Sequence, residues 1–314
     1  MKPGDQVDFT LKTIQPFPDG NLYMVLEDVN GFRFLQDYKP YASYGLKPGT
    51  KISCKVDKIN CNGKIFLEPR HPWFEEGQNY ELPIVSRFKF QSFIALTVLD
   101  QGDKLHMLFT AEAPTSSSLL CSIVSIRKGQ VIMEPADGNL RTPLPGKNGI
   151  FETIFEGAPV SDSGVEGVAL FSLGTIPLMT YLRCLPPQCQ VGDKILCLIK
   201  TGSRQAEPVD PKLLPGHSLK LTYLTYETRP DLLRGPKTFI FAEDGGKNRY
   251  EILVTASKAA HLEPGDPLTA VVRTYKCGQP VFELASPHSL HTLQGSRLYC
   301  FVPATEYAQK VLMQ

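Results

Sequence analysis

Five cations lie along a single predicted hairpin near the N-terminus: Lys51, Lys55, Lys58, Lys64 and Arg70. Side chains at alternating strand positions share one face, so several of these cations could meet the same ligand. Lysines gathered in this way can contact the phosphates of a nucleic acid. An ordinary solvated outer face explains the pattern equally well. Lys55, Lys58 and Lys64 are the candidate phosphate-binding residues of this hairpin.

Aromatic side chains accompany the cations at both ends of the chain. Phe32 and Phe34 are two residues apart, so both rings should point to the same side of their strand. Exposed rings stack on the bases of single strands, whereas apolar strand residues more often belong to the core. A second aromatic and basic set lies further along, at Tyr223, Tyr226, Arg249 and Tyr250. We take Tyr223 and Arg249 as its candidate binding residues.

Catalysis and metal binding have little support in the sequence. None of the six histidines lies in a metal-ligand or nucleophile motif, and the eight cysteines form no Cys-x-x-Cys pair. We therefore expect no catalytic residue, no metal site and no cofactor, and a protein that is not an enzyme. Reduced thiols are expected, with Cys54, Cys121 and Cys197 packing as small apolar residues.

A sequence motif that recurs four times indicates the strands that carry these residues. It appears as GKIFLEPRHP from Gly63, GQVIMEPADG from Gly129, SRQAEPVDP from Ser203 and GQPVFELASP from Gly278. An apolar strand precedes each copy, with Cys54, Cys121, Cys197 and Ala270 at one shared position. Proline cannot donate to a strand ladder, so the Glu-Pro pair should end the last strand of each repeat.

The whole repeat has room for five strands: an opening strand, a hairpin, a variable connection and a final hairpin. Five antiparallel strands in roughly 70 residues can close into a small barrel, which removes exposed edges. We predict an all-β tandem array of four small five-stranded OB-like barrels with a short C-terminal strand and helix tail. Val56 and Ile59 are expected to line the first barrel.

The domain boundaries follow from the repeat. Barrels are expected at residues 1–74, 75–143, 144–212 and 213–288, and the third of these is the divergent copy. Residues 289–314 are either a truncated fifth repeat or a tail that caps the fourth barrel.

The first repeat has a more specific likeness. Its segments PGDQVDFTLKTI, NGFRFLQD and LKPGTKISCKVDKINCNGKIFLEP resemble the OB-type RNA-binding domain first known from a small-subunit ribosomal protein. The resemblance implies binding on the second and third strands, with Phe32 at the Gly-Phe position and Tyr23 near the aromatic of the preceding strand. It also implies a basic position at Lys64. The histidine that usually follows the Gly-Phe strand is missing here, and the second and third repeats do not keep the binding aromatics.

Charge limits the mode of binding. The net charge of +1 argues against a strongly basic, sequence-independent DNA binder. Residues 1–72 and 213–314 each carry a net +2, while the middle repeats are slightly acidic. We expect single-stranded nucleic acid as the ligand, with RNA favoured over DNA, bound by the first and the fourth repeat. The alternative is a protein-interaction scaffold, which acidic or apolar outer faces would favour.

Membrane insertion is not expected. No apolar run approaches the ~18 residues of a membrane-spanning helix, and the first residues, MKPGDQVDF, lack the apolar core of a signal peptide. The sequence predicts a soluble, cytoplasmic protein with no membrane partner.

Overall fold

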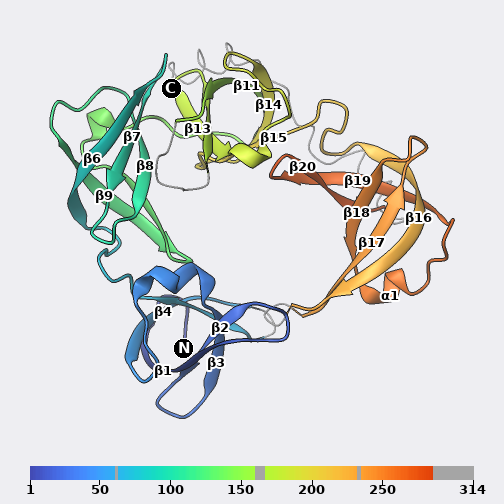
Figure 1. Cartoon of the computed structure of the whole chain (residues 1–314), viewed down its shortest axis with the longest axis horizontal. Helices are drawn as coiled ribbons and strands as arrows, with labels where there is room; N and C mark the ends of the chain where they lie inside the picture. The colour runs from blue at the N-terminus through green and yellow to red at the C-terminus, as the bar shows by residue number, and fades with distance from the viewer. Residues whose placement is uncertain (61–62, 160–166, 232–234, 286–314) are drawn as a thin grey trace. The chain divides into compact units, whose positions relative to one another are not determined.

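The computed structural model describes residues 1–60, 63–159, 167–231 and 235–285. These residues form an all-β fold of four consecutive five-stranded modules, which confirms the predicted fold class (Figure 1). The expected C-terminal strand and helix lie outside the described residues. In the part of the chain that is described, no helix is both long enough and apolar enough to cross a membrane.

The strands of each module are as follows. Module 1 contains β1 (Gln6–Pro16), β2 (Leu22–Glu27), β3 (Arg33–Asp37), β4 (Lys51–Ile59) and β5 (Ile65–Pro69). Module 2 contains β6 (Asn79–Lys89), β7 (Ile94–Leu99), β8 (Leu105–Thr110), β9 (Ser118–Arg127) and β10 (Gln130–Pro135). Module 3 contains β11 (Gly149–Gly157), β12 (Val168–Leu173), β13 (Ile176–Tyr181), β14 (Lys194–Ile199) and β15 (Ala206–Pro208). Module 4 contains β16 (Ser218–Arg229), β17 (Lys237–Glu243), β18 (Arg249–Val254), β19 (Pro267–Lys276) and β20 (Gln279–Leu284).

All four modules share one strand order, in which the first strand lies between the second and the fourth. Module 4 is a closed barrel, β16-β17-β18-β20-β19, because its third and fifth strands pair in parallel at Ile252 and Phe282. The other three sheets are hydrogen-bonded as half-barrels, with the third and fifth strands at the two ends. In module 3 a single parallel bridge between Met179 and Gln205 spans that gap, since β15 has only three residues to offer.

Equivalent residues of the repeat occupy equivalent places. The three cysteines of the shared position are fully buried. Each lies opposite the proline of its Glu-Pro pair: Cys54 opposite Pro69, Cys121 opposite Pro135 and Cys197 opposite Pro208. β5, β10 and β15 all end at that proline. The predicted repeat register and the role of Glu-Pro as a strand end are thereby confirmed.

Ile59 departs from the prediction that it lines module 1. Val56 is fully buried, but Ile59 is 38% exposed. The register of β4 against β5 shifts between Val56 and Lys58, and the strand end beyond this irregularity leaves the core. The matching residue of module 2, Ile126, is buried. Simple alternation from Cys54 cannot anticipate this shift.

The chain divides into two compact units, one built mainly from residues 1–141 and the other mainly from residues 142–285. Each unit therefore contains two successive modules. Short helical elements join the third and fourth strands: η1 (Lys39–Tyr44) in module 1, η3 (Leu182–Cys184) in module 3 and α1 (Ala256–Ala259) in module 4. A further turn, η2 (Gly138–Leu140), follows module 2.

Candidate nucleic-acid interface

The β4–β5 hairpin of module 1 brings an aromatic ring and two cations together. Lys58 on β4 lies directly opposite Phe66 on β5. The ammonium nitrogen of Lys58 is 4.7 Å from the centroid of the Phe66 ring, and that of Lys64 is 5.9 Å from it. The ring is half-buried. We call Lys58, Lys64 and Phe66 the Phe66 cluster.

The cluster has the parts that single-strand binding needs. Cations within about 6 Å of a ring centroid are held by the negative face of the ring. A flat ring can stack on a base of any sequence, while neighbouring ammonium groups contact the phosphates on either side. Lys58 and Lys64, both sequence-predicted, are thus brought together, whereas Phe66 was missed.

Phe66 could have been found by aligning the repeats. The residue two positions before the repeated glutamate is Phe66, Ile132, Gln205 or Val281. Ile132 and Val281 are exposed, so this position faces outward in these modules too. Module 1 alone among the four repeats places an aromatic there.

Tyr23 is not available to a ligand. Its side chain is only 2% exposed and packs edge-to-face against Phe17. Its hydroxyl donates a hydrogen bond to Asp19 at 2.5 Å. Burial, followed by the nearby Asp19 carboxylate, raises the pKa of Tyr23 to about 12. The predicted stacking role of Tyr23 is wrong, because the ring is buried and packs against Phe17.

Phe32 is exposed, as binding would require, but it stands apart from Tyr23. It is 66% exposed in the β2–β3 turn, where Asp28 accepts hydrogen bonds from the backbone N–H groups of Asn30 and Phe32. Tyr23 pairs with Asp37 at the other end of the hairpin. The two rings are therefore separated by roughly 15 Å of strand, and they do not form one groove. Phe34 instead packs edge-to-face on buried Phe9.

Lys55 is engaged within the first unit. Its ammonium group lies 2.7 Å from the carboxylate of Glu76, which also accepts the backbone N–H of Ile126. Although burial opposes it, hydrogen bonding from Lys55 holds the pKa of Glu76 below its usual value. Lys55 thus links module 1 to module 2, a role that cannot be seen from the lysine spacing.

The fourth module offers a ring-and-cation set of a different kind. Tyr223 is buried in the core of the barrel, at 2% exposure, so its predicted role is wrong. Arg249 is exposed at the start of β18, opposite Glu243. Arg229 lies over Phe239 at 4.6 Å, but its guanidinium also bonds Glu227 and Glu251. Carboxylates therefore balance the charge of this cation.

The buried histidines of the first unit have structural partners. His71 Nδ1 accepts the backbone N–H groups of Trp73 and Phe74, and the ring stacks on Phe74. His106 Nε2 is 2.7 Å from the buried carboxylate of Asp100. Burial lowers the pKa of His71 to about 4. Within the described residues, no group of three or more histidines, cysteines or acids is placed to hold a metal ion.

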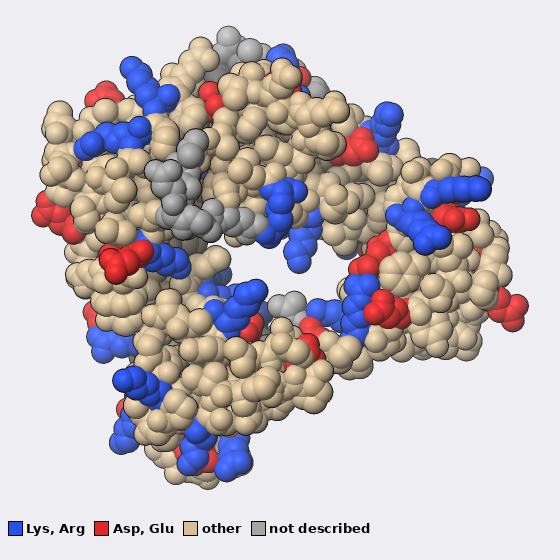
Figure 2. Space-filling view, in the orientation of Figure 1, with Lys and Arg blue, Asp and Glu red and all other residues tan. Residues whose placement is uncertain are grey.

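No family model matches this chain, and no curated protein is significantly similar to it. The class of the protein is therefore defined by its fold and by the Phe66 cluster: an all-β protein of four five-stranded modules, the fourth a closed barrel. Figure 2 shows basic and acidic side chains interspersed over the visible face.

Proposed function

We propose that the protein is a non-catalytic module that binds single-stranded nucleic acid, RNA in preference to DNA, through module 1. The observation that carries this proposal is the half-buried Phe66 ring with Lys58 and Lys64 over it. Phe32 is a second exposed aromatic ring of the same module. Arg249 is exposed in module 4 and provides a second, weaker contact.

The chemistry favours single strands over duplex. A ring can stack only on a base that is not already stacked on both sides in a helix. The net charge of residues 1–72 is only +2, so few phosphates are neutralised and affinity should be modest. RNA is favoured by the likeness of the first repeat to RNA-binding domains.

The test is a fluorescence titration of the full chain with labelled oligo-U, oligo-dT and a duplex, at two salt concentrations. We expect both single strands to bind at low salt, with the duplex weaker. Lys58→Gln should make the salt slope shallower by about 0.7, the value for one phosphate contact on a single strand. Lys55→Gln is the matched control, because Lys55 is paired with Glu76.

Absence of binding by oligo-U and oligo-dT at about 100 µM protein in low salt would overturn the proposal, since even non-specific contacts reach that affinity range. An equal effect of Lys55→Gln and Lys58→Gln would move the site away from the Phe66 cluster.

A second candidate function, a protein-interaction scaffold, rests on module 2. Four apolar side chains of its strands β6, β9 and β10 are exposed by half or more: Val85, Leu120, Val124 and Ile132. Apolar side chains gathered on an outer face are typical of protein contacts. The same titration separates the two functions, because a scaffold would leave all three oligonucleotides unbound.

A further inference from the structure

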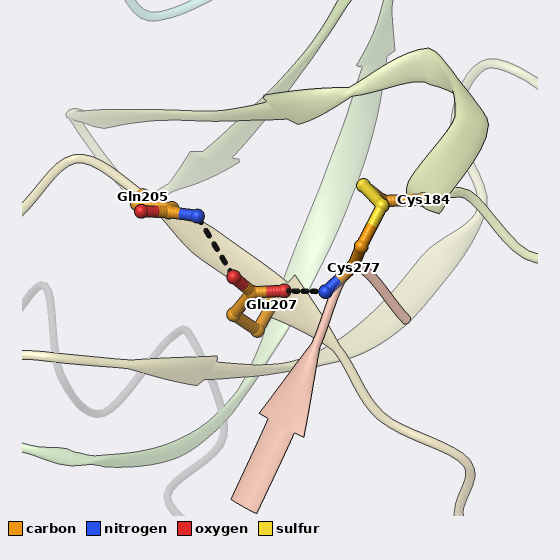
Figure 3. Close-up of a disulfide and its surroundings, with 4 residues drawn as sticks. All are labelled: Cys184, Gln205, Glu207 and Cys277. Atoms are coloured by element: carbon orange, nitrogen blue, oxygen red, sulfur yellow. Dashed lines mark hydrogen bonds between the residues drawn. A yellow bond between two sulfur atoms is a disulfide. The ribbon is translucent and has the colours of Figure 1, made fainter. Parts of the chain in front are cut away.

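Both units contain the same joint between their two modules. In the first unit, the β9–β10 turn presents the backbone N–H groups of Lys128 and Gly129 to the carboxylate of Glu68, at 2.6 and 3.0 Å. In the second unit, the β19–β20 turn presents the N–H of Cys277 to Glu207 at 2.7 Å (Figure 3). Glu68 and Glu207 are the repeated glutamates of the two leading modules, so the glutamate of one module caps a turn of the next.

The turns themselves match in conformation. Lys128 and Gly129 have φ angles of 50° and 68°, and Cys277 and Gly278 have 51° and 71°. Two successive positive φ angles define the tight hairpin turn that suits the twist of paired strands.

Each turn glycine is also pressed against the module before it. A Cβ atom at Gly129 would come within 2.1 Å of the carbonyl oxygen of Pro40 in η1. One at Gly278 would come within 2.5 Å of the carbonyl oxygen of Cys184 in η3. Pro40 and Cys184 therefore occupy equivalent places.

The two joints differ in that the second contains a covalent cross-link. Cys277 stands where the first joint has Lys128, and Cys184 stands where it has Pro40. A disulfide joins the two cysteines across the second joint (Figure 3), with their Cα atoms 4.4 Å apart. The expectation that the thiols are reduced is therefore wrong for this pair. The buried cysteines Cys54, Cys121 and Cys197 remain free thiols.

The second joint also holds without the bond. Ile150, Leu198 and Val209 of module 3 share one apolar core with module 4. The hydroxyl of buried Tyr275 accepts a hydrogen bond from the backbone N–H of Asp210, at 3.2 Å. Loss of the disulfide would leave a joint of the kind that the first unit uses throughout, closed by a glutamate cap and apolar packing.

We propose that the Cys184–Cys277 disulfide is a redox-sensitive latch, which locks module 3 to module 4 when oxidised and leaves a non-covalent hinge when reduced. Cys184 is buried and Cys277 half-buried, so a reductant reaches the bond from the Cys277 side. The reductant is a dithiol: its thiolate attacks the Cys277 sulfur, and Cys184 leaves as a thiolate that takes up a proton. The second thiol of the reductant then displaces Cys277, which is protonated in turn, and the reductant ends as a disulfide.

The test compares amide hydrogen exchange of the full chain in its oxidised and dithiol-reduced states, after peptide mapping of the disulfide. We expect a linked peptide pair containing Cys184 and Cys277 in the oxidised protein. Reduction should speed exchange in the β19–β20 turn about tenfold or more, because local opening of the joint becomes easier. The β9–β10 turn at Lys128 and Gly129 is an internal control and should not respond.

Cys184→Ser provides the matched variant. Its amide hydrogen exchange should match that of the reduced protein, and addition of the dithiol should not change its exchange rates. If this variant loses protection throughout module 3, Cys277→Ser replaces it with the same expectation, and the redox comparison of the unaltered chain stands without any variant.

Three results would overturn the latch. The first is the absence of the linked peptide pair after oxidation of the native protein. The second is equal exchange in the β19–β20 turn in the two redox states. The third is a dithiol response that persists in Cys184→Ser, which would place the redox-active group elsewhere.

Discussion

Phe66 shows how one side chain distinguishes module 1 from the others at a position they all possess. The equivalent Ile132 of module 2 is 52% exposed and carries no aromatic ring. Phe66 has the ammonium groups of Lys58 and Lys64 close to its ring, and these keep a flat apolar surface next to positive charge. Stacking and phosphate contact can then occur at the same place.

Phe66→Ala should weaken binding of oligo-U by ~1–3 kcal/mol, the value of one base stacked on an aromatic ring. The measurement is the fluorescence titration at constant salt. Ile132→Ala, at the same position of module 2, should leave affinity unchanged. Circular dichroism of both variants should match the unaltered chain, since neither position is fully buried. Equal losses in the two variants would contradict a site at module 1.

His71 carries a pH dependence of stability. Burial lowers its pKa from the ordinary value of 6.5 to about 4, and two backbone N–H groups point at its unprotonated Nδ1. The unfolded chain binds a proton near pH 6.5 and the folded chain does not. The stability contribution is therefore complete above that pH and is lost as pH falls toward about 4.

We expect the free energy of unfolding of the first unit to drop between about pH 7 and pH 4.5, and to drop less in His71→Asn. Asparagine keeps a hydrogen-bond acceptor near the Nδ1 position but does not titrate. The readout is fluorescence of Trp73, the single tryptophan of the chain, which contacts His71. Identical pH profiles in the two proteins would show that folding does not lower the pKa of His71.

Among the elements, the hairpin of the fourth and fifth strands has different surroundings in different modules. In modules 2 and 4 it docks on the preceding module, and its turn is capped by Glu68 or Glu207. Residues near its tip are then buried, as Ile126 and Tyr275 are. In module 1 the same hairpin carries exposed Ile59 and the Phe66 cluster. The hairpin thus forms a joint in the second module of each unit and a candidate binding surface in module 1.

Gly129→Ala should destabilise the first unit more than Gly63→Ala. Both glycines have positive φ angles, so alanine is strained in either turn by ~1 kcal/mol. Only the Cβ at Gly129 would also collide with the carbonyl of Pro40, because nothing lies within 4 Å of a Cβ at Gly63. Denaturant unfolding followed by Trp73 fluorescence measures both. Equal losses would show that the joint does not constrain this turn.

At the scale of the whole molecule, two units repeat one plan, and only the second of their joints carries a described disulfide. The bond connects residues 93 positions apart, so it closes a long loop in the unfolded chain. Cross-links of this kind stabilise mainly by restricting the unfolded state. The two units should therefore respond differently to a reductant.

Reduction should lower the free energy of unfolding of the second unit by ~2–5 kcal/mol and leave the first unit unchanged. Far-UV circular dichroism follows strands of both units, whereas Trp73 reports on the first unit alone. We expect a dithiol to shift part of the dichroism transition to lower denaturant without moving the fluorescence transition. A shift of both transitions would mean that the two units unfold as one.

The all-β class, the five-strand repeat and the shared cysteine position could be predicted from the sequence. These features depend on local chemistry: residue alternation along a strand, glycine in tight turns and proline at a strand end. Cys54, Cys121 and Cys197 repeat at one register because each faces the same kind of core.

The candidate site was only half predictable. Lys58 and Lys64 could be chosen as binding residues because they lie along one hairpin. Tyr23 and Tyr223, also chosen from the sequence, proved to be buried. The sequence of a strand shows that alternate residues face opposite sides of the sheet. It does not show which of the two sides is covered by another part of the protein.

Tertiary structure alone decided the contacts between residues far apart in the chain. Lys55 pairs with Glu76 across a module boundary, and Cys184 meets Cys277 only because a turn of module 4 docks on η3. Ile59 is exposed while Ile126, at the same place in the repeat, is buried. The local sequence that forms each hairpin is similar, but burial depends on whether a neighbouring module excludes water from it, and no single repeat encodes that neighbour.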